Sequence, residues 1–179
     1  MTLNAAAHPS HAPNVVNPGV LPALAIAFIA ADTLAGAWFF QLVLDIRPCP
    51  LCLEQRYAYY LAVPLGLALA FAASRRAPQS VLLAGFAALL LAALANAWLG
   101  GYHAGVEWKF WEGPTDCSGP IVNLGSAGNL LERLDTEKVI RCDEVQWRFL
   151  GLSLAGYNVL ISLAMAAIAV WGIVSAKRA

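Results

Sequence analysis

The sequence predicts an all-α integral membrane protein, a bundle of four transmembrane helices with a long outer loop that carries a short interfacial helix. Of its 179 residues 60% are hydrophobic and only 12% are charged, which is not the composition of a soluble domain. Four apolar segments are long enough to cross roughly 30 Å of hydrocarbon at about 1.5 Å per residue. The formal net charge is zero and no basic cluster is present, so nucleic-acid binding is set aside.

The chain is expected to form one membrane domain after a short tail. Residues 1–20 contain three prolines but no lysine or arginine, so they lack the basic start of a signal peptide and are interpreted as a disordered tail. The remaining residues, 21–179, hold the four spans, which we place at residues 21–44, 55–73, 79–101 and 152–175. The first span carries Asp32 near its middle. We expect a neutral, hydrogen-bonded interior carboxyl there, with a proton relay as the alternative.

The basic residues of the short loops orient the four spans. Arg75 and Arg76 lie between spans two and three, and Lys177 and Arg178 follow span four. Short loops rich in lysine and arginine stay in the cytoplasm. Both termini are therefore predicted to be cytoplasmic, and the loops at 45–54 and 102–151 are predicted to lie outside.

The long outer loop contains one helical pattern. Ala127, Leu130, Leu131 and Leu134 recur at helical spacing, with mostly polar residues between them. This pattern is typical of a short helix that lies on the bilayer surface. The third span is expected to end before this loop, at the flexible pair Gly100-Gly101.

A Cys-x-x-Cys motif, Cys49 to Cys52, separates the first two spans and is preceded by Pro48. Proline is favoured at the first position of a helix, so Pro50 predicts that the second helix begins near residues 50–53. Cys52 then lies in the first turn, where free backbone N–H groups stabilise a thiolate. Arg56 is one turn later on the same face. We therefore predict that the Cys52 thiol is activated for electron transfer.

Two other interpretations of the four cysteines are open at this point. A four-cysteine zinc site normally uses two closely spaced pairs, but Cys117 and Cys142 are far apart, so no metal site is expected. Alternatively, the chain is a four-span structural or adaptor protein with disulfides in its outer loops. That reading leaves the tight Cys-x-x-Cys ring unexplained, because so small a ring adds little stability through chain entropy.

The sequence resembles the disulfide bond formation protein B (DsbB) family of bacterial inner membranes over nearly all of the chain after the tail. The resemblance rests on Gln41 eight residues before Cys49, on Arg47-Pro48-Cys49-Pro50-Leu51-Cys52 followed by Arg56, on a lone Cys117, and on Cys142 followed by Gln146-Trp147-Arg148-Phe149-Leu150-Gly151-Leu152.

This resemblance implies a function and a set of site residues. The function is that of a protein-dithiol:quinone oxidoreductase, which reoxidises a periplasmic DsbA-like oxidase of thioredoxin fold and passes the electrons to ubiquinone or menaquinone. Cys49 and Cys52 match the pair near the quinone. Cys117 and Cys142 match the pair that faces the partner, with Cys117 expected to form the mixed disulfide. Arg56, Gln41 and His103 are the expected quinone contacts, although the spacing from His103 to Cys117 departs from the family pattern.

Overall fold

The structure is a computed structural model that describes residues 18–114 and 141–178. Four of its helices are long and apolar enough to cross a membrane. They are α1 (Val20–Leu42), α2 (Pro50–Ser74), α3 (Gln79–Glu107) and α5 (Leu154–Lys177). Strands β1 (Arg148–Phe149) and β2 (Leu152–Ser153) form a short antiparallel hairpin before α5. The predicted four-helix membrane fold is confirmed.

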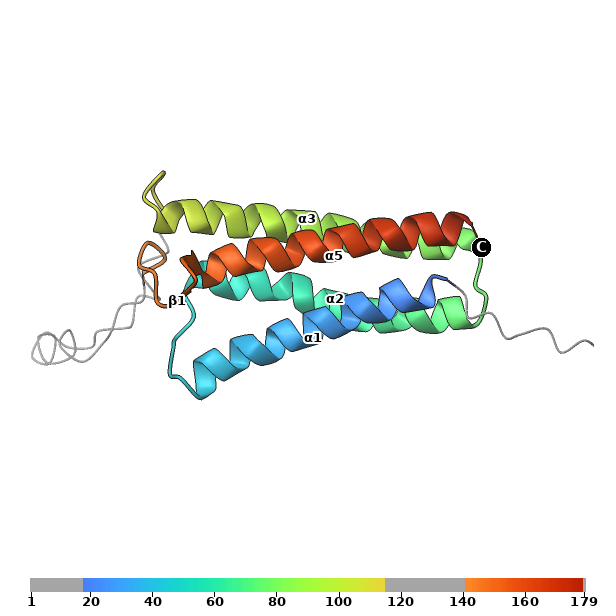
Figure 1. The fold of residues 1–179 in the computed structure, drawn as a ribbon, viewed down its shortest axis with the longest axis horizontal. Helices are drawn as coiled ribbons and strands as arrows, with labels where there is room; N and C mark the ends of the chain where they lie inside the picture. Colours follow the sequence, from blue (N-terminus) through green and yellow to red (C-terminus); the bar gives the residue numbers. More distant parts are fainter. Residues whose placement is uncertain (1–17, 115–140, 179) are drawn as a thin grey trace, which may run out of the picture.

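The four helices run alternately up and down, so functional segments gather at one end of the bundle (Figure 1). The start of α1, the connection between α2 and α3, and the end of α5 lie at one end. The turn between α1 and α2 and the β1–β2 hairpin lie at the other, which we call the outer end. The outer end of α1 leans away from the other helices in Figure 1. This divergence matters for the cavity described below.

The beginning of α2 follows from its prolines. Pro50 occupies the first helical turn, and Cys49 is the N-cap residue with an extended backbone. The Cys49 side chain accepts a hydrogen bond from the backbone N–H of Cys52. A proline at this position sacrifices no helical hydrogen bond, because the first N–H groups of a helix have no partner within it.

The predicted end of the third span at Gly100-Gly101 is wrong, because α3 continues to Glu107. Gly100 does not break the helix but allows close packing. A Cβ atom there would lie 2.8 Å from Asn158 Nδ2 and 3.1 Å from Val159 Cγ2 on α5. The extra turns place His103 and Glu107 on a rigid helix rather than in a loop.

An apolar core joins the four helices, and a polar layer lies nearer the outer end. Ile26, Phe86 and Ala169 are among the fully buried residues of the core. The polar layer links α2, α3 and α5 through mutual hydrogen bonds of the side chains of Tyr59, Asn96, Asn158 and Ser162. Each buried polar group therefore has a partner, as a low-dielectric interior requires.

The hairpin fixes the start of α5 against the end of α3. Its turn residues Leu150 and Gly151 have φ angles of 48° and 84°, as a tight hairpin turn requires. Ser153 caps α5 by accepting from the Gly156 N–H, and its hydroxyl also donates to the Glu107 carboxylate. The predicted interfacial helix at residues 127–134 and nearly all of the predicted tail lie outside the described residues.

Candidate functional site

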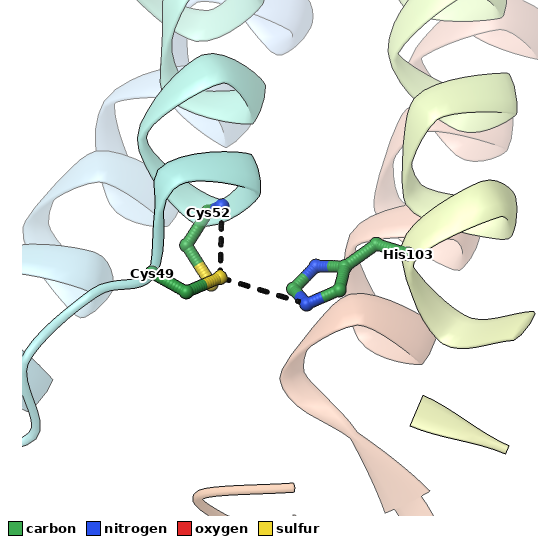
Figure 2. Close-up of side chains that lie close together, drawn as sticks. All are labelled: Cys49, Cys52 and His103. Atoms are coloured by element: carbon green, nitrogen blue, oxygen red, sulfur yellow. Dashed lines mark hydrogen bonds between the residues drawn. The ribbon is translucent and has the colours of Figure 1, made fainter. Parts of the chain in front are cut away.

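The centre of the site is the dithiol formed by Cys49 and Cys52 at the outer end of α2. Their Sγ atoms are 2.9 Å apart. Figure 2 shows His103 reaching across from α3 toward Cys49, with its Nε2 atom 3.6 Å from Cys49 Sγ. Cys49 is 3% exposed. The two sulfurs are thus close enough to form a disulfide and are sheltered from bulk water.

Hydrogen bonds converge on Cys49, which differs from the prediction that Cys52 is the activated thiol. The Cys52 thiol, the His103 ring and the Cys52 backbone N–H all contact Cys49 Sγ, and together they lower the pKa of Cys49 to about 5 against the opposing effect of burial. The physical reason is the position of the helix start. Because Cys49 is the N-cap residue, its sulfur reaches the free N–H of Cys52. At neutral pH the reduced site therefore holds a thiolate at Cys49.

A cavity of about 510 Å³ lies beside Cys52. Its walls come mainly from α1, α2 and α5, the first, second and fourth spans, together with the segment before β1. Most of the lining is apolar, including Phe40 and Trp147, whose ring centroids are 4.9 Å apart. Cys52 lines this cavity and Cys49 does not. The two sulfurs therefore face different surroundings.

Arg56 is the cationic group one turn along α2 from Cys52, and it lines the cavity. The residue is 9% exposed. It donates to Gln41 Oε1 at 2.8 Å and to the Ala37 carbonyl oxygen at 3.4 Å, and it lies over the Trp38 ring at 5.4 Å from the centroid. Gln41, a predicted quinone contact, is not part of the cavity lining. It instead anchors Arg56 to α1, an indirect role that spacing in the sequence does not reveal.

His103 contacts the dithiol and also lines the cavity. Its Nδ1 atom is 2.9 Å from Gln55 Nε2, and its Nε2 atom is 3.9 Å from Glu107 Oε1. Gln55 and Glu107 were not identified from the sequence as site residues. The signals that could have found them are the polar positions they occupy in apolar spans, since polar groups in membranes usually have a structural or functional partner.

Cys142 lies in the same buried cluster as Cys49 of the dithiol. It is 1% exposed and packs in one cluster with Cys49, Leu51 and Val106, and its backbone hydrogen-bonds with the His103 ring. Cys142 is disulfide-bonded, which argues against the four-cysteine zinc site. Cys117 lies outside the described residues. The neighbouring Asp143 binds Lys109 and Arg141, and these two cations lower the pKa of its carboxyl to about 2.

Asp32 lines the inner part of the cavity together with Thr33. The predicted hydrogen-bonded carboxyl is not observed, because Asp32 has no side-chain hydrogen bond within residues 18–114 and 141–178. The alternative given for Asp32, a proton relay, stays untested. Tyr59 and Asn158 of the polar layer also line the cavity, so its inner wall is less apolar than the sequence pattern indicates.

Comparison with known proteins gives consistent matches. The family model described as "Disulfide bond formation protein DsbB" matches residues 20–172. The chain is 31% identical to proteins named "Disulfide bond formation protein B" from Azoarcus sp. and Hahella chejuensis. These alignments cover 83% and 86% of this chain and 88% and 92% of the relatives. A protein of the same name from Nitrosococcus oceani is also 31% identical, over 80% of this chain and 85% of the relative.

Proposed function

This chain belongs to the disulfide bond formation protein DsbB family, and we propose that it is a thiol oxidase that passes electrons from a periplasmic DsbA-like oxidase to a membrane quinone, ubiquinone or menaquinone. The general part of this function, disulfide formation at a membrane, follows from the family and the four spans. One observation supports the specific part of the proposal, electron transfer from a partner dithiol to a quinone. The two sulfurs of one dithiol differ in their surroundings, because Cys52 lines the cavity, whereas Cys49 does not line it and is buried in the cluster that contains Cys142.

The residues around the cavity fit a quinone. Quinone rings need apolar walls with a few oriented donors, and the cavity combines aromatic and aliphatic walls with the guanidinium of Arg56. The two observed hydrogen bonds of Arg56 use two of the five N–H donors of a guanidinium. When bound, a quinone supplies a two-electron acceptor. Arg56 would donate a hydrogen bond to it, Cys52 would be the dithiol sulfur beside it, and the aromatic walls would exclude water.

The order of the sulfurs supports a direction of electron flow. A partner dithiol reduces the Cys117–Cys142 disulfide that the family resemblance implies, and the resulting thiolate reduces the Cys49–Cys52 disulfide. Thiol exchange needs an accessible sulfur and a leaving thiol of low pKa. Cys142 and Cys49 are buried in one cluster. Cys49, the sulfur with the lowered pKa, is the better leaving thiol in the second exchange, when the outer pair closes its disulfide. Electrons then reach the cavity through Cys52.

The alternative is a structural or adaptor protein with outer disulfides. A structural disulfide explains a buried, bonded Cys142. It does not explain why Cys49 carries three hydrogen-bond contacts at a helix start or why its partner Cys52 lines a cavity. Extraction of quinone from the purified protein separates the two, because an adaptor has no use for one.

Location in the bacterial inner membrane, with both termini in the cytoplasm and the cysteine loops in the periplasm, is part of the proposal. Fusions of reporter proteins after Arg76 and after Arg178 should read as cytoplasmic, and a fusion near Gly125 should read as periplasmic. A periplasmic Arg76 would invert the protein and remove the oxidising compartment that its disulfides need.

Arg56→Ala should raise the apparent KM for quinone by about tenfold or more, since a buried charged donor to the ring is lost. Oxidation of the partner by the Cys117–Cys142 pair should stay nearly unchanged. Steady-state rates at varied quinone concentration measure the first, and a single-turnover thiol assay measures the second. Arg75→Ala, at the opposite end of α2, is the matched control. Equal losses of both activities in Arg56→Ala would contradict this role.

A further inference from the structure

Gln55 is a buried polar side chain that lines the cavity and has been given no role in the electron path described above. It lies on α2 one turn after Leu51 and is 5% exposed. Its Nε2 atom donates to the backbone carbonyl oxygen of Leu51 at 3.1 Å and lies 2.9 Å from His103 Nδ1. The amide thus connects the helix that carries the dithiol to the histidine that faces it.

These two contacts determine the orientation of the amide. A backbone carbonyl oxygen can only accept hydrogen bonds, so the Gln55 atom beside Leu51 must be the nitrogen. The second hydrogen of that nitrogen then points at His103 Nδ1, which must accept. In a neutral imidazole whose Nδ1 accepts, the proton is on Nε2. A protonated Nε2 has no lone pair for a metal ion, although the donor atoms of Cys49, Cys52 and His103 lie within 4.8 Å of one another.

The Nε2–H group of His103 faces the sulfur that receives electrons. Nε2 is 3.6 Å from Cys49 Sγ, compared with 3.9 Å from Glu107 Oε1, and the backbone of Cys142 also hydrogen-bonds with the ring. We propose that Gln55 is a positioning residue that holds His103 in the Nε2–H tautomer, so that this N–H is directed at Cys49 and stabilises its thiolate. The role of that thiolate in turnover rests on the proposed function, whereas the tautomer itself does not.

The stabilised thiolate matters in the exchange between the two pairs. A thiolate of the outer pair attacks Cys49 Sγ, the Cys49–Cys52 bond breaks, and Cys52 leaves as a thiolate. The second outer thiolate then attacks the outer sulfur of this mixed disulfide, and Cys49 leaves as a thiolate. The outer pair loses two electrons and two protons to become a disulfide, and the inner pair gains the two electrons. One proton goes to Cys52, which hydrogen-bonds with Cys49 Sγ, and the other is released to water. His103 donates a hydrogen bond to the leaving sulfur without transferring its proton.

Nitrogen-15 NMR of labelled histidine tests the tautomer directly. His8→Gln and His11→Gln leave His103 as the one histidine of the chain. In this background, with reduced protein in lipid nanodiscs, the spectrum should show a protonated Nε2 and an unprotonated Nδ1. Gln55→Glu, which is nearly the same size, should protonate Nδ1 because a carboxylate can only accept. Glu54→Gln, its exposed neighbour, is the matched control and should change nothing.

A second measurement tests the effect on Cys49. The alkylation rate of Cys49 is followed against pH in a background where Cys52, Cys117 and Cys142 are serine. In that background, among the residues that the structure describes, the titratable groups that face Cys49 are His103 and Glu107 on α3. Gln55→Leu should raise the midpoint by roughly one pH unit, as the loss of one directed hydrogen bond to a thiolate predicts. Glu54→Gln should leave the midpoint in place.

Three results would overturn the inference: a wild-type Nδ1–H tautomer, a tautomer that Gln55→Glu leaves unchanged, or a Cys49 midpoint that Gln55→Leu does not raise. Neither measurement uses quinone or a partner protein. If the tautomer inference fails, the proposed thiol oxidase activity is unaffected. If that activity is not found, the tautomer result is likewise unaffected.

Discussion

Cys52→Ser is expected to abolish quinone-linked turnover while it leaves one stoichiometric oxidation of a DsbA-like partner by the outer cysteine pair. The reason is geometric, because Cys52 is the sulfur that lines the cavity. Cys49→Ser should have the same effect, since it removes the dithiol sulfur that is buried in one cluster with Cys142. Partner thiols titrated over time should show a single burst of one equivalent and then no further oxidation.

Cys142→Ser provides the complementary variant. It leaves Cys117 without its partner cysteine, so a mixed disulfide between Cys117 and the DsbA-like partner should accumulate and be visible on a non-reducing gel. Adding Cys117→Ser should remove that complex. If the partner were instead trapped on Cys49 or Cys52, the assignment of the two pairs would be wrong.

Gly36→Phe should lower kcat/KM for quinone by about tenfold or more, because it fills the cavity with a ring. Gly36 lines the cavity, and a Cβ atom there would have no neighbour within 4 Å. The substitution therefore adds bulk to the cavity without a clash at Cβ. The single-turnover oxidation of the partner should be unchanged, because the cysteines are untouched.

Gly101→Phe is the matched control for this variant. A Cβ atom at Gly101 also has no neighbour within 4 Å, but Gly101 lies on α3 outside the cavity lining. We expect its quinone kinetics to match those of the wild type. Normal quinone kinetics in Gly36→Phe would show that the cavity is not where the acceptor binds.

The spans could be predicted from the sequence because length and apolar composition alone define a helix that crosses a bilayer. The helix start at Pro50 was also predictable, since proline has a clear positional preference. The end of α3 could not be predicted from the sequence. A glycine pair is typical of a helix end, but Gly100 serves the close approach of Asn158 from another helix, which no local pattern encodes.

The residues of the site could be predicted from the sequence better than the contacts between them. Cys49, Cys52, Arg56 and His103 do gather around one dithiol and one cavity. The local pattern indicated Cys52 as the activated thiol, whereas the contacts from His103 and Cys52 favour Cys49. Gln55 and His103 are 48 residues apart in sequence, so their contact depends on how α2 packs against α3. The role of Cys117 and the interfacial helix stay predictions.

The most direct test of the central claim is an anaerobic electron count. Purified protein is mixed with a reduced DsbA-like partner and a soluble ubiquinone analogue, and the partner's disulfides and the reduced quinone are measured together. The account predicts one quinone reduced for each disulfide formed over many turnovers, with no quinone reduction in Cys52→Ser. Disulfides that form without matching quinone reduction, or quinone reduction that persists in Cys52→Ser, would contradict it.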